Sequence, residues 1–307
     1  MSEMYQKTIV TPVKLQGVGL HSGKNSTIKI LPAEENQGIV FKRVDLKLNN
    51  IVSANYENVS SAKLCTTLEN EHGVKISTVE HLLAALYIIG IDNAIIEINN
   101  EEVPIMDGSA KDFLSILQKT KIKNLTEKRK YLKVIDNVEL IDGSRKISIK
   151  PNNSFEVDFQ LNYENKIIGQ QKNQVNFQNN NLKDIVESRT FCLFEDIEKI
   201  KKIGLAKGGS LENAVVVKQN EVLNENGLRN KKEFVNHKIL DLAGDFLLSG
   251  YRVLGKVTCY QGGHELTNMF LRKLLTSKSA FKIIEIEEII NSKKINFDEL
   301  TKIAVNA

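Results

Sequence analysis

The chain has 307 residues, of which 41% are hydrophobic and 26% charged, enough for two globular domains with sizeable cores. Its formal net charge of +4 is spread along the sequence, which argues against a nucleic-acid-binding protein. Its three cysteines are widely spaced and form no CxxC pair, which predicts a protein of the reducing cytoplasm without a disulfide framework. The sequence starts without an apolar leader, and its longest apolar run has only ten residues (82–91), so we expect neither a secretory signal nor a membrane anchor.

The first segment, residues 5–43, is predicted to form strands broken by turns, because β-branched and apolar residues alternate with polar ones. Within it, Gly17, Gly19 and Gly23 flank His21. A histidine in such a glycine-shaped segment is either a simple turn residue or part of a pocket. The sequence leaves both interpretations open.

The clearest helix of the first half is predicted in STVEHLLAALYIIG. Ser77 or Thr78 would be its N-cap and Gly90 its end, and Glu80 would be the carboxylate of a capping box. His81 falls in the first helical turn. There the helix dipole disfavours a protonated imidazole and favours the neutral form that binds metals.

The second half begins after a charged, apolar-poor run, residues 119–130, which predicts a linker between domains. Residues 131–163 alternate as strands, with a hairpin turn at Asp142-Gly143. The Asn/Gln-rich residues 170–181 predict a loop, and residues 195–203 a helix. AFKIIEIEE predicts a last strand, followed by a short helix in the tail. Runs of strands followed by helices, without strict βαβ alternation, favour α+β domains.

The strongest candidate for chemistry is a helix predicted in FVNHKILDLAGDFLLSG, whose apolar residues recur at helical spacing. His237, Asp241 and Asp245 follow one another at intervals of four and so lie along one face. An imidazole and a carboxylate one turn apart can bind one metal ion together with a third ligand from elsewhere. The alternative is a polar helix face with an internal His–Asp hydrogen bond.

A third ligand is available in His81, which would join His237 and Asp241 to give two nitrogens and one oxygen. Such a set, with a position left open for water, is typical of catalytic zinc sites. Glu80, next to His81, would then serve as general base toward the metal-bound water. Two histidines and an aspartate also suit Fe(II) or Co(II), so the sequence leaves the native metal open.

Several motifs, in order, carry a family resemblance from about residue 5 to residue 275. GVGLHSG, STVEHLLAALYIIGIDNAIIEINNEEVPIMDGSA, SRTF, GLAKGGSLENAVVV, FVNHKILDLAGD and GGHELTN resemble the motifs of the UDP-3-O-acyl-N-acetylglucosamine deacetylases. The resemblance implies a zinc-dependent hydrolase that removes the N-acetyl group from UDP-3-O-(3-hydroxyacyl)-N-acetylglucosamine. The products would be acetate and the free 2-amino sugar nucleotide, in the committed step of lipid A and lipopolysaccharide biosynthesis.

The resemblance also implies a fold of two similar two-layer α+β sandwich domains, each with a small insert, and an active site at their junction. On this sequence the domains would be residues 1–125 and 126–307, and the insert near residues 193–215 would form an apolar passage for the acyl chain. The protein would be a monomer working at the inner face of the cytoplasmic membrane. The apolar residues for the passage, or for an ordinary amphipathic helix instead, are Leu193, Phe194, Ile197, Ile200, Ile203 and Leu205.

Matched motif by motif, the resemblance implies that His81, His237 and Asp241 bind zinc and that Glu80 is the general base. The other residues that it implies are His264 as general acid or oxyanion stabiliser, Thr190 as oxyanion donor, Lys238 to meet substrate oxygen or phosphate charge, Asp245 to orient His264, and Phe191 and Cys65 in the substrate pocket.

Two other functions stay open on the sequence. One is a hydrolase of the same fold acting on another acylated amino sugar. The other is a non-catalytic sugar-nucleotide or lipid-binding protein with a structural metal. Structural zinc sites favour four-ligand, cysteine-rich sets, and they would not need Glu80, Thr190 or His264. The sequence therefore favours an enzyme.

Overall fold

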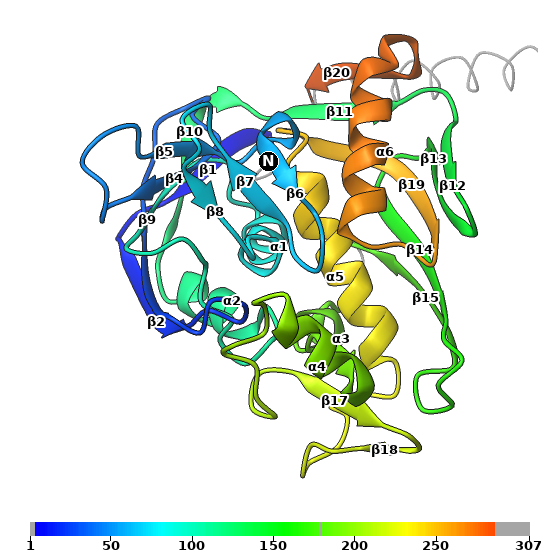
Figure 1. Ribbon diagram of the computed structural model, residues 1–307. Coiled ribbons are helices and arrows are strands. Elements are labelled where there is room, and N and C mark those ends of the chain that lie inside the picture. The colour runs from blue at the N-terminus through cyan, green and yellow to red at the C-terminus, as the bar shows by residue number, and fades with distance from the viewer. Residues whose placement is uncertain (1–3, 179, 286–307) are drawn as a thin grey trace, which may run out of the picture.

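The computed structural model describes residues 4–178 and 180–285. Within these residues, long runs of strands are interrupted by single helices rather than alternating regularly with them (Figure 1). This mixed composition agrees with the predicted α+β class. Helices α1 (Glu80–Ile89) and α5 (Glu233–Leu247) pack against each other in the middle of the molecule. None of the helices in the described part of the chain combines the length and hydropathy that a bilayer crossing requires.

The first half of the chain builds a five-stranded sheet in the order β2-β3-β9-β4-β5. β9 lies in its middle, antiparallel to β3 and parallel to β4. A small antiparallel sheet, β6-β7-β8, leads directly into α1. The strands are β2 (Val13–Val18), β3 (Asn25–Leu31), β4 (Ile39–Arg43), β5 (Ile51–Ser53), β6 (Val59–Ser61), β7 (Thr67–Glu69), β8 (Lys75–Ile76) and β9 (Ala94–Ile98), with a 3-10 turn, η1 (Tyr56–Asn58), before β6.

The second half builds a seven-stranded sheet around one long strand, β19. The beginning of β19 runs parallel to β11, and its remainder lies between β13 and β14. β12 extends the sheet beyond β13, β15 beyond β14, and β20 beyond β11. The strands are β11 (Lys130–Val134), β12 (Val138–Asp142), β13 (Arg145–Pro151), β14 (Phe155–Asn162), β15 (Gln170–Asn176), β19 (Arg252–Tyr260) and β20 (Phe281–Glu285).

The remaining elements cover the sheets and build the region around the beginning of α5. β16 runs parallel to β17, which pairs with β18 in a small sheet. Helix α4 confirms the helix predicted at residues 195–203. The elements are α2 (Lys111–Gln118), α3 (Lys183–Val186), β16 (Phe191–Leu193), α4 (Phe194–Lys202), β17 (Val215–Lys218), β18 (Glu221–Val222), α6 (His264–Thr276) and η2 (Lys278–Ala280).

Two segments form strands against expectation. The predicted linker at residues 119–130 contains β10 (Ile122–Lys128), which pairs antiparallel with β1 (Tyr5–Ile9). Leu125 of β10 is buried, so even this charged run contributes to the core. The loop predicted at residues 170–181 is wrong over β15, which pairs with β14 along its whole length. Backbone pairing with a well-packed neighbour here outweighs the low strand propensity of asparagine.

Two other predictions of local structure are confirmed. The hairpin between β12 and β13 turns at Gly143, whose φ of 58° suits glycine. The predicted last strand is present as β20 up to Glu285. Its remaining residues and the short helix predicted in the tail lie outside the described residues.

The start of α1 differs from the prediction, whereas its end does not. Val79 is the N-cap, without a side-chain hydrogen bond. Thr78 instead has a φ of 57°, and its hydroxyl donates to Glu102 at 3.0 Å. Long-range pairing of this segment has therefore replaced local capping. Gly90 ends the helix as predicted, with a φ of 86°.

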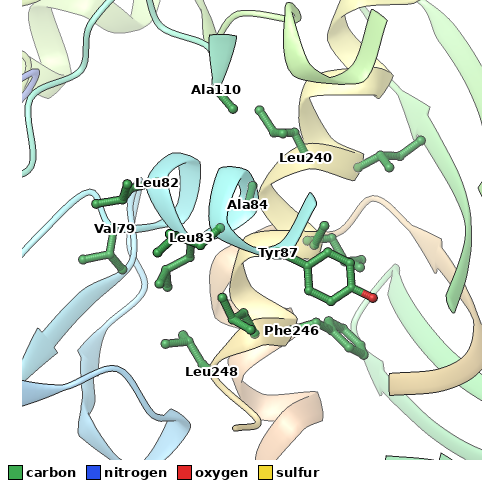
Figure 2. Packing of buried hydrophobic residues seen from close by; sticks show 14 of the residues in the cluster. Val79, Leu82, Leu83, Ala84, Tyr87, Ala110, Leu240, Phe246 and Leu248 are labelled. Carbon is green, nitrogen blue, oxygen red and sulfur yellow. The ribbon is translucent and has the colours of Figure 1, made fainter. Parts of the chain in front are cut away.

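The core is continuous through α1 and α5. Every residue of α5 except Lys238 is buried, including its histidine and its acidic residues. Figure 2 shows Ala84 and Tyr87 of α1 with Leu240 and Phe246 of α5 among the buried side chains that fill this region. The polar face of α5 is thus enclosed by protein.

Candidate active site

Three of the predicted site residues meet where α1 and α5 cross. His81 comes from α1, and His237 and Asp241 come from α5. All three are buried, and one candidate ligand atom from each lies within 4.8 Å of the others. Oδ1 of Asp241 is 3.4 Å from Nε2 of His81 and 3.3 Å from Nε2 of His237. Helix packing therefore assembles the predicted ligand set from distant parts of the sequence.

The arrangement fits a bound cation. Oδ1 of Asp241 is buried and has no hydrogen-bond partner among the described residues. A buried carboxylate oxygen without a donor is costly unless a cation satisfies it. Nδ1 of His237 lies 3.1 Å from the backbone carbonyl of Ser188, which can only accept, so Nδ1 carries the proton and Nε2 is left free as a ligand. Two imidazole nitrogens and one carboxylate oxygen suit zinc.

The protonation states agree with this interpretation. Burial lowers the pKa of His237 to about 3, so its imidazole is neutral. Burial disfavours the charge of Asp241, but nearby positive charges, among them those of Lys238 and His264, outweigh it and hold the pKa of that carboxyl well below its usual value. Nζ of Lys238 donates to Oδ2 of Asp241 at 3.2 Å, and this contact raises the pKa of Lys238 against the effect of burial. The cluster thus presents the carboxylate of Asp241 and the neutral imidazole of His237 at neutral pH.

Glu80 lies beside the ligand cluster, at the first residue of α1. Its carboxylate is 3% exposed, and burial raises its pKa. Oε2 accepts a hydrogen bond from the backbone N–H of Thr66 at 3.0 Å, which leaves Oε1 facing Nε2 of His264 at 3.7 Å. A carboxylate with a raised pKa next to a metal-ligand cluster is suited to take a proton.

His264 closes the site from the start of α6 and is buried there. Its Nδ1 lies 2.8 Å from Oδ2 of Asp245, and its Nε2 faces Glu80 and Asp241. Burial opposes a charge on this imidazole, but the carboxylates of Asp245, Glu80 and Asp241 outweigh it and raise the pKa of His264 to about 9. His264 is therefore protonated at neutral pH and can donate a proton.

Thr66 joins these groups, although no sequence pattern singled it out. Its hydroxyl donates to Oδ1 of Asp245 at 2.7 Å and lies 3.3 Å from Nδ1 of His264, while its backbone N–H holds Glu80. The residue is buried just before β7. A threonine in a strand-like stretch is ordinary in sequence, and only the folded structure shows which partners it meets.

Thr190 is held next to the site by its own backbone hydrogen bond and by a buried ion pair of its neighbour Arg189. The N–H of Thr190 donates to the carbonyl of Gly108 at 2.8 Å, tying it to the first half of the chain. Its neighbour Arg189 forms a 2.8 Å ion pair with Glu233 at the start of α5, and both side chains are almost fully buried. The segment around Thr190 is therefore fixed to α5, which carries two of the three candidate ligands.

Two adjoining hollows open beside the cluster. The polar groove has a volume of about 380 Å³ and lies next to His264, and its charged lining residues are Lys63, Arg145, Asp196, Lys238 and Glu265. The apolar cavity has a volume of about 390 Å³ and lies between β16, α4 and β17. The residues that line both hollows are Leu64, Thr190, Phe191, Cys192 and Ile200.

The residues expected to line the acyl-chain passage do not all lie in the same hollow. Phe194, Ile197 and Ile200 line the apolar cavity, and Leu193 lines the polar groove. Neither hollow is lined by Leu205 or by Ile203, which is 58% exposed.

The two residues expected in the substrate pocket also differ in their placement. The ring of Phe191 lies in both hollows and packs edge-on against Phe234, with centroids 4.9 Å apart. Cys65 lines neither hollow. It is buried beside Thr67, and burial raises the pKa of its thiol to about 12, so the sulfur stays protonated.

Comparison with known proteins gives one consistent result. Residues 6–276 match the family model described as UDP-3-O-acyl N-acetylglycosamine deacetylase. A protein of Shewanella violacea with the name UDP-3-O-acyl-N-acetylglucosamine deacetylase is 42% identical over 287 residues, covering 92% of this chain and 94% of its own. A protein of the same name from Shewanella frigidimarina is 43% identical over 288 residues, covering 93% of this chain and 94% of its own.

Proposed function

Since the chain belongs to the UDP-3-O-acyl N-acetylglycosamine deacetylase family, we propose that it hydrolyses the N-acetyl group of a UDP-3-O-acyl-N-acetylglucosamine. The products are acetate and the free 2-amino sugar nucleotide, and the reaction belongs to lipid A biosynthesis. One observation carries the proposal: the unpartnered carboxylate oxygen of Asp241 faces the imidazoles of His81 and His237 beside Glu80 and His264.

The proposed metal ligands are Nε2 of His81, Nε2 of His237 and Oδ1 of Asp241. A zinc ion held there would polarise the amide carbonyl and lower the pKa of a bound water toward neutrality. Fe(II) suits the same donors, so the native metal is a question for metal analysis. The carbonyl of Ser188 orients His237 for this role.

The proposed acid–base chemistry uses two groups, Glu80 and His264, whose Oε1 and Nε2 lie 3.7 Å apart. Glu80, with its raised pKa, takes a proton from the attacking water. Protonated His264 and the hydroxyl of Thr190 donate to the oxygen of the tetrahedral intermediate, and each such donor is typically worth a few kcal/mol. A proton held on Glu80 or His264 then passes to the departing amine. Asp245 keeps His264 charged and oriented.

The two hollows would hold the two ends of the substrate. In the polar groove, Lys63, Arg145 and Lys238 would meet the charge of the diphosphate, and the other polar lining residues would meet the sugar. The apolar cavity beside α4 suits an acyl chain, including a 3-hydroxyacyl chain. Phe191 lies in both hollows and would contact the substrate where the two ends meet. Cys65, which we expected in the pocket, would act only through its packing.

The finer architecture is also part of the proposal. We assign residues 1–125 and 126–307 to two α+β domains of sandwich type, with the catalytic groups at their junction and an acyl-binding insert near residues 193–215. The continuous core through α1 and α5 supports a fixed junction. A cytoplasmic monomer that meets its substrate at the inner membrane face fits this assignment.

Acetate release tests the proposal directly. Purified protein is assayed with UDP-3-O-(3-hydroxyacyl)-N-acetylglucosamine as isolated, after chelation, and after zinc is restored. Loss on chelation and recovery with zinc would support both the reaction and the metal site. A folded, metal-replete protein that releases acetate from no acylated amino sugar would contradict the proposal and point to a binding protein.

A further inference from the structure

His21, which the sequence left between a turn and a pocket role, is held firmly in its loop. Its backbone N–H donates to Oε1 of Glu102 at 2.8 Å, and the N–H of Ser22 donates to Oε2 at 2.7 Å. The hydroxyl of Thr78, just before α1, donates to the same carboxylate at 3.0 Å. Glu102 is buried, so this clamp fixes the loop relative to the helix that carries Glu80 and His81.

The opposite side of the His21 loop rests on the loop after α4. The N–H of Gly208 donates to the carbonyl of Leu20 at 3.0 Å, and the N–H of Lys207 donates to that of His21 at 3.3 Å. A β-carbon at Gly208 would collide with the carbonyl oxygen of Gly19, so the two backbones touch where both residues are glycine. His21 is enclosed between the two loops, and its side chain lines the apolar cavity.

The tautomer of His21 follows from its one side-chain hydrogen bond. The N–H of Ala206 donates to Nδ1 at 3.4 Å, so Nδ1 is the acceptor and Nε2 carries the proton. Burial and the charge of His264 outweigh the opposing effect of Glu102 and lower the pKa of His21, which keeps the ring neutral. The ring therefore has a fixed acceptor side and a fixed donor side.

The donor side has no partner. Nε2 of His21 makes no hydrogen bond to any described residue. It is also shielded from solvent, since the residue is only 8% exposed. Buried donors in proteins are almost always paired, and one that is not needs an explanation. The cavity lining is mainly apolar, and neither Thr190 nor Ser210, which contribute hydroxyls to it, makes a hydrogen bond to this donor. An acceptor brought by a ligand would satisfy the donor.

We propose that the Nε2–H of His21 donates a hydrogen bond to an oxygen of the substrate's acyl group as the chain enters the apolar cavity. The inference rests on the proposed function and names a substrate contact that it did not include. An acyl chain has its oxygens at the sugar end, namely the ester carbonyl and, in a 3-hydroxyacyl group, the hydroxyl. His21 lies toward that end, because it lines the same cavity as Thr190, which also lines the polar groove beside His264.

The test compares three substrates: the 3-hydroxyacylated sugar nucleotide, an acylated one of equal length without the hydroxyl, and UDP-N-acetylglucosamine without any acyl group. His21→Leu removes the donor, and His21→Gln retains an N–H donor on a side chain of similar reach. We expect His21→Leu to lose about tenfold in kcat/KM on acylated substrate relative to UDP-N-acetylglucosamine, as for one neutral hydrogen bond. His21→Gln should recover much of that loss.

The pattern of loss identifies the oxygen. A loss confined to the hydroxylated substrate assigns the contact to the hydroxyl, and an equal loss on both acylated substrates assigns it to the ester carbonyl. Equal effects on all three substrates, with metal content and melting temperature unchanged, would overturn the inference. If the wild-type protein releases no acetate from any of them, the proposed function has failed instead.

A measurement on the unaltered protein covers the case in which His21→Leu does not fold. The imidazole ¹⁵N signals of His21 can be followed while the deacetylated product, UDP-3-O-(3-hydroxyacyl)-glucosamine, is added. We expect the Nε2 signal to shift with this product and to stay in place with UDP-glucosamine. A signal that responds equally to both ligands, or to neither at saturation, would contradict a hydrogen bond to the acyl group.

Discussion

The hydroxyl of Thr66 donates a hydrogen bond to Oδ1 of Asp245 at 2.7 Å, across 179 positions of sequence. The backbone N–H of Thr66 donates at the same time to Glu80. One residue therefore fixes the carboxylate that orients His264 and the proposed general base. The two groups proposed to move protons are positioned relative to each other by this residue, in addition to their own helices.

Replacing Thr66 with valine should slow turnover while leaving metal binding intact. Valine keeps the backbone N–H and the approximate shape but leaves Oδ1 of Asp245 without its hydroxyl donor. Loss of such an outer partner typically costs about 10–100-fold in activity. Thr66→Ser is the matched control, since it restores a hydroxyl and should recover most of kcat. Equal activity of the valine and serine variants would show that the hydroxyl has no positioning role.

Metal analysis should distinguish variants of the proposed metal ligands from variants of the proposed base. His237→Ala removes a proposed ligand and should bind less than one equivalent of zinc. Glu80→Ala leaves the three ligands in place, so it should keep its zinc and lose roughly two to four orders of magnitude in turnover. Zinc content by mass spectrometry and acetate release are measured on the same samples. Full activity of Glu80→Ala would exclude it as the base.

Activity should fall as the pH rises through about 9, the pKa of His264. The protonated form is the donor, and deprotonation removes it. The raised pKa of His264 also stabilises the folded protein. Because this pKa lies above the ordinary histidine value of about 6.5, the stabilisation is fully present below about pH 6.5 and is lost as the pH rises to about 9.

The carboxylate of Asp245 is the main group that raises the pKa of His264. Asp245→Asn should therefore move the alkaline limb of the kcat/KM profile to lower pH. The profile is measured at constant ionic strength, with the wild-type protein in parallel. An unchanged alkaline limb in Asp245→Asn would mean that another group titrates there.

Gly244 sets how closely α5 approaches α1. A β-carbon at this position would collide with the backbone carbonyl of Glu80. Gly244→Ala should therefore destabilise the protein by about 1–3 kcal/mol, as overpacking usually does, although alanine alone favours a helix. Gly263→Ala is the control, since a β-carbon there meets no atom within 4 Å. Urea unfolding compares the two, and a Gly244→Ala variant as stable as the wild type would show that the helices can separate at no cost.

Local structure was predictable where short-range patterns decide it. The helical spacing of α5 and the glycine after α1 act within one or two turns, and both predictions hold. The predictions failed where long-range pairing decides. Thr78 bonds to Glu102 instead of capping α1, and the charged strand β10 is formed by pairing with β1. Neither partner can be recognised from the neighbouring sequence.

The sequence by itself determined the chemical inventory: two histidines and an aspartate of metal-binding type, an adjacent glutamate, and a set of ordered motifs that identify the family. Only the tertiary structure decided how these groups meet. His81 reaches His237 because a glycine lets α5 cross α1 at close range, and His264 is charged because three buried carboxylates surround it. Distances and burial set the pKa values and the free donor of His21. They arise from packing between distant segments, which no local pattern encodes.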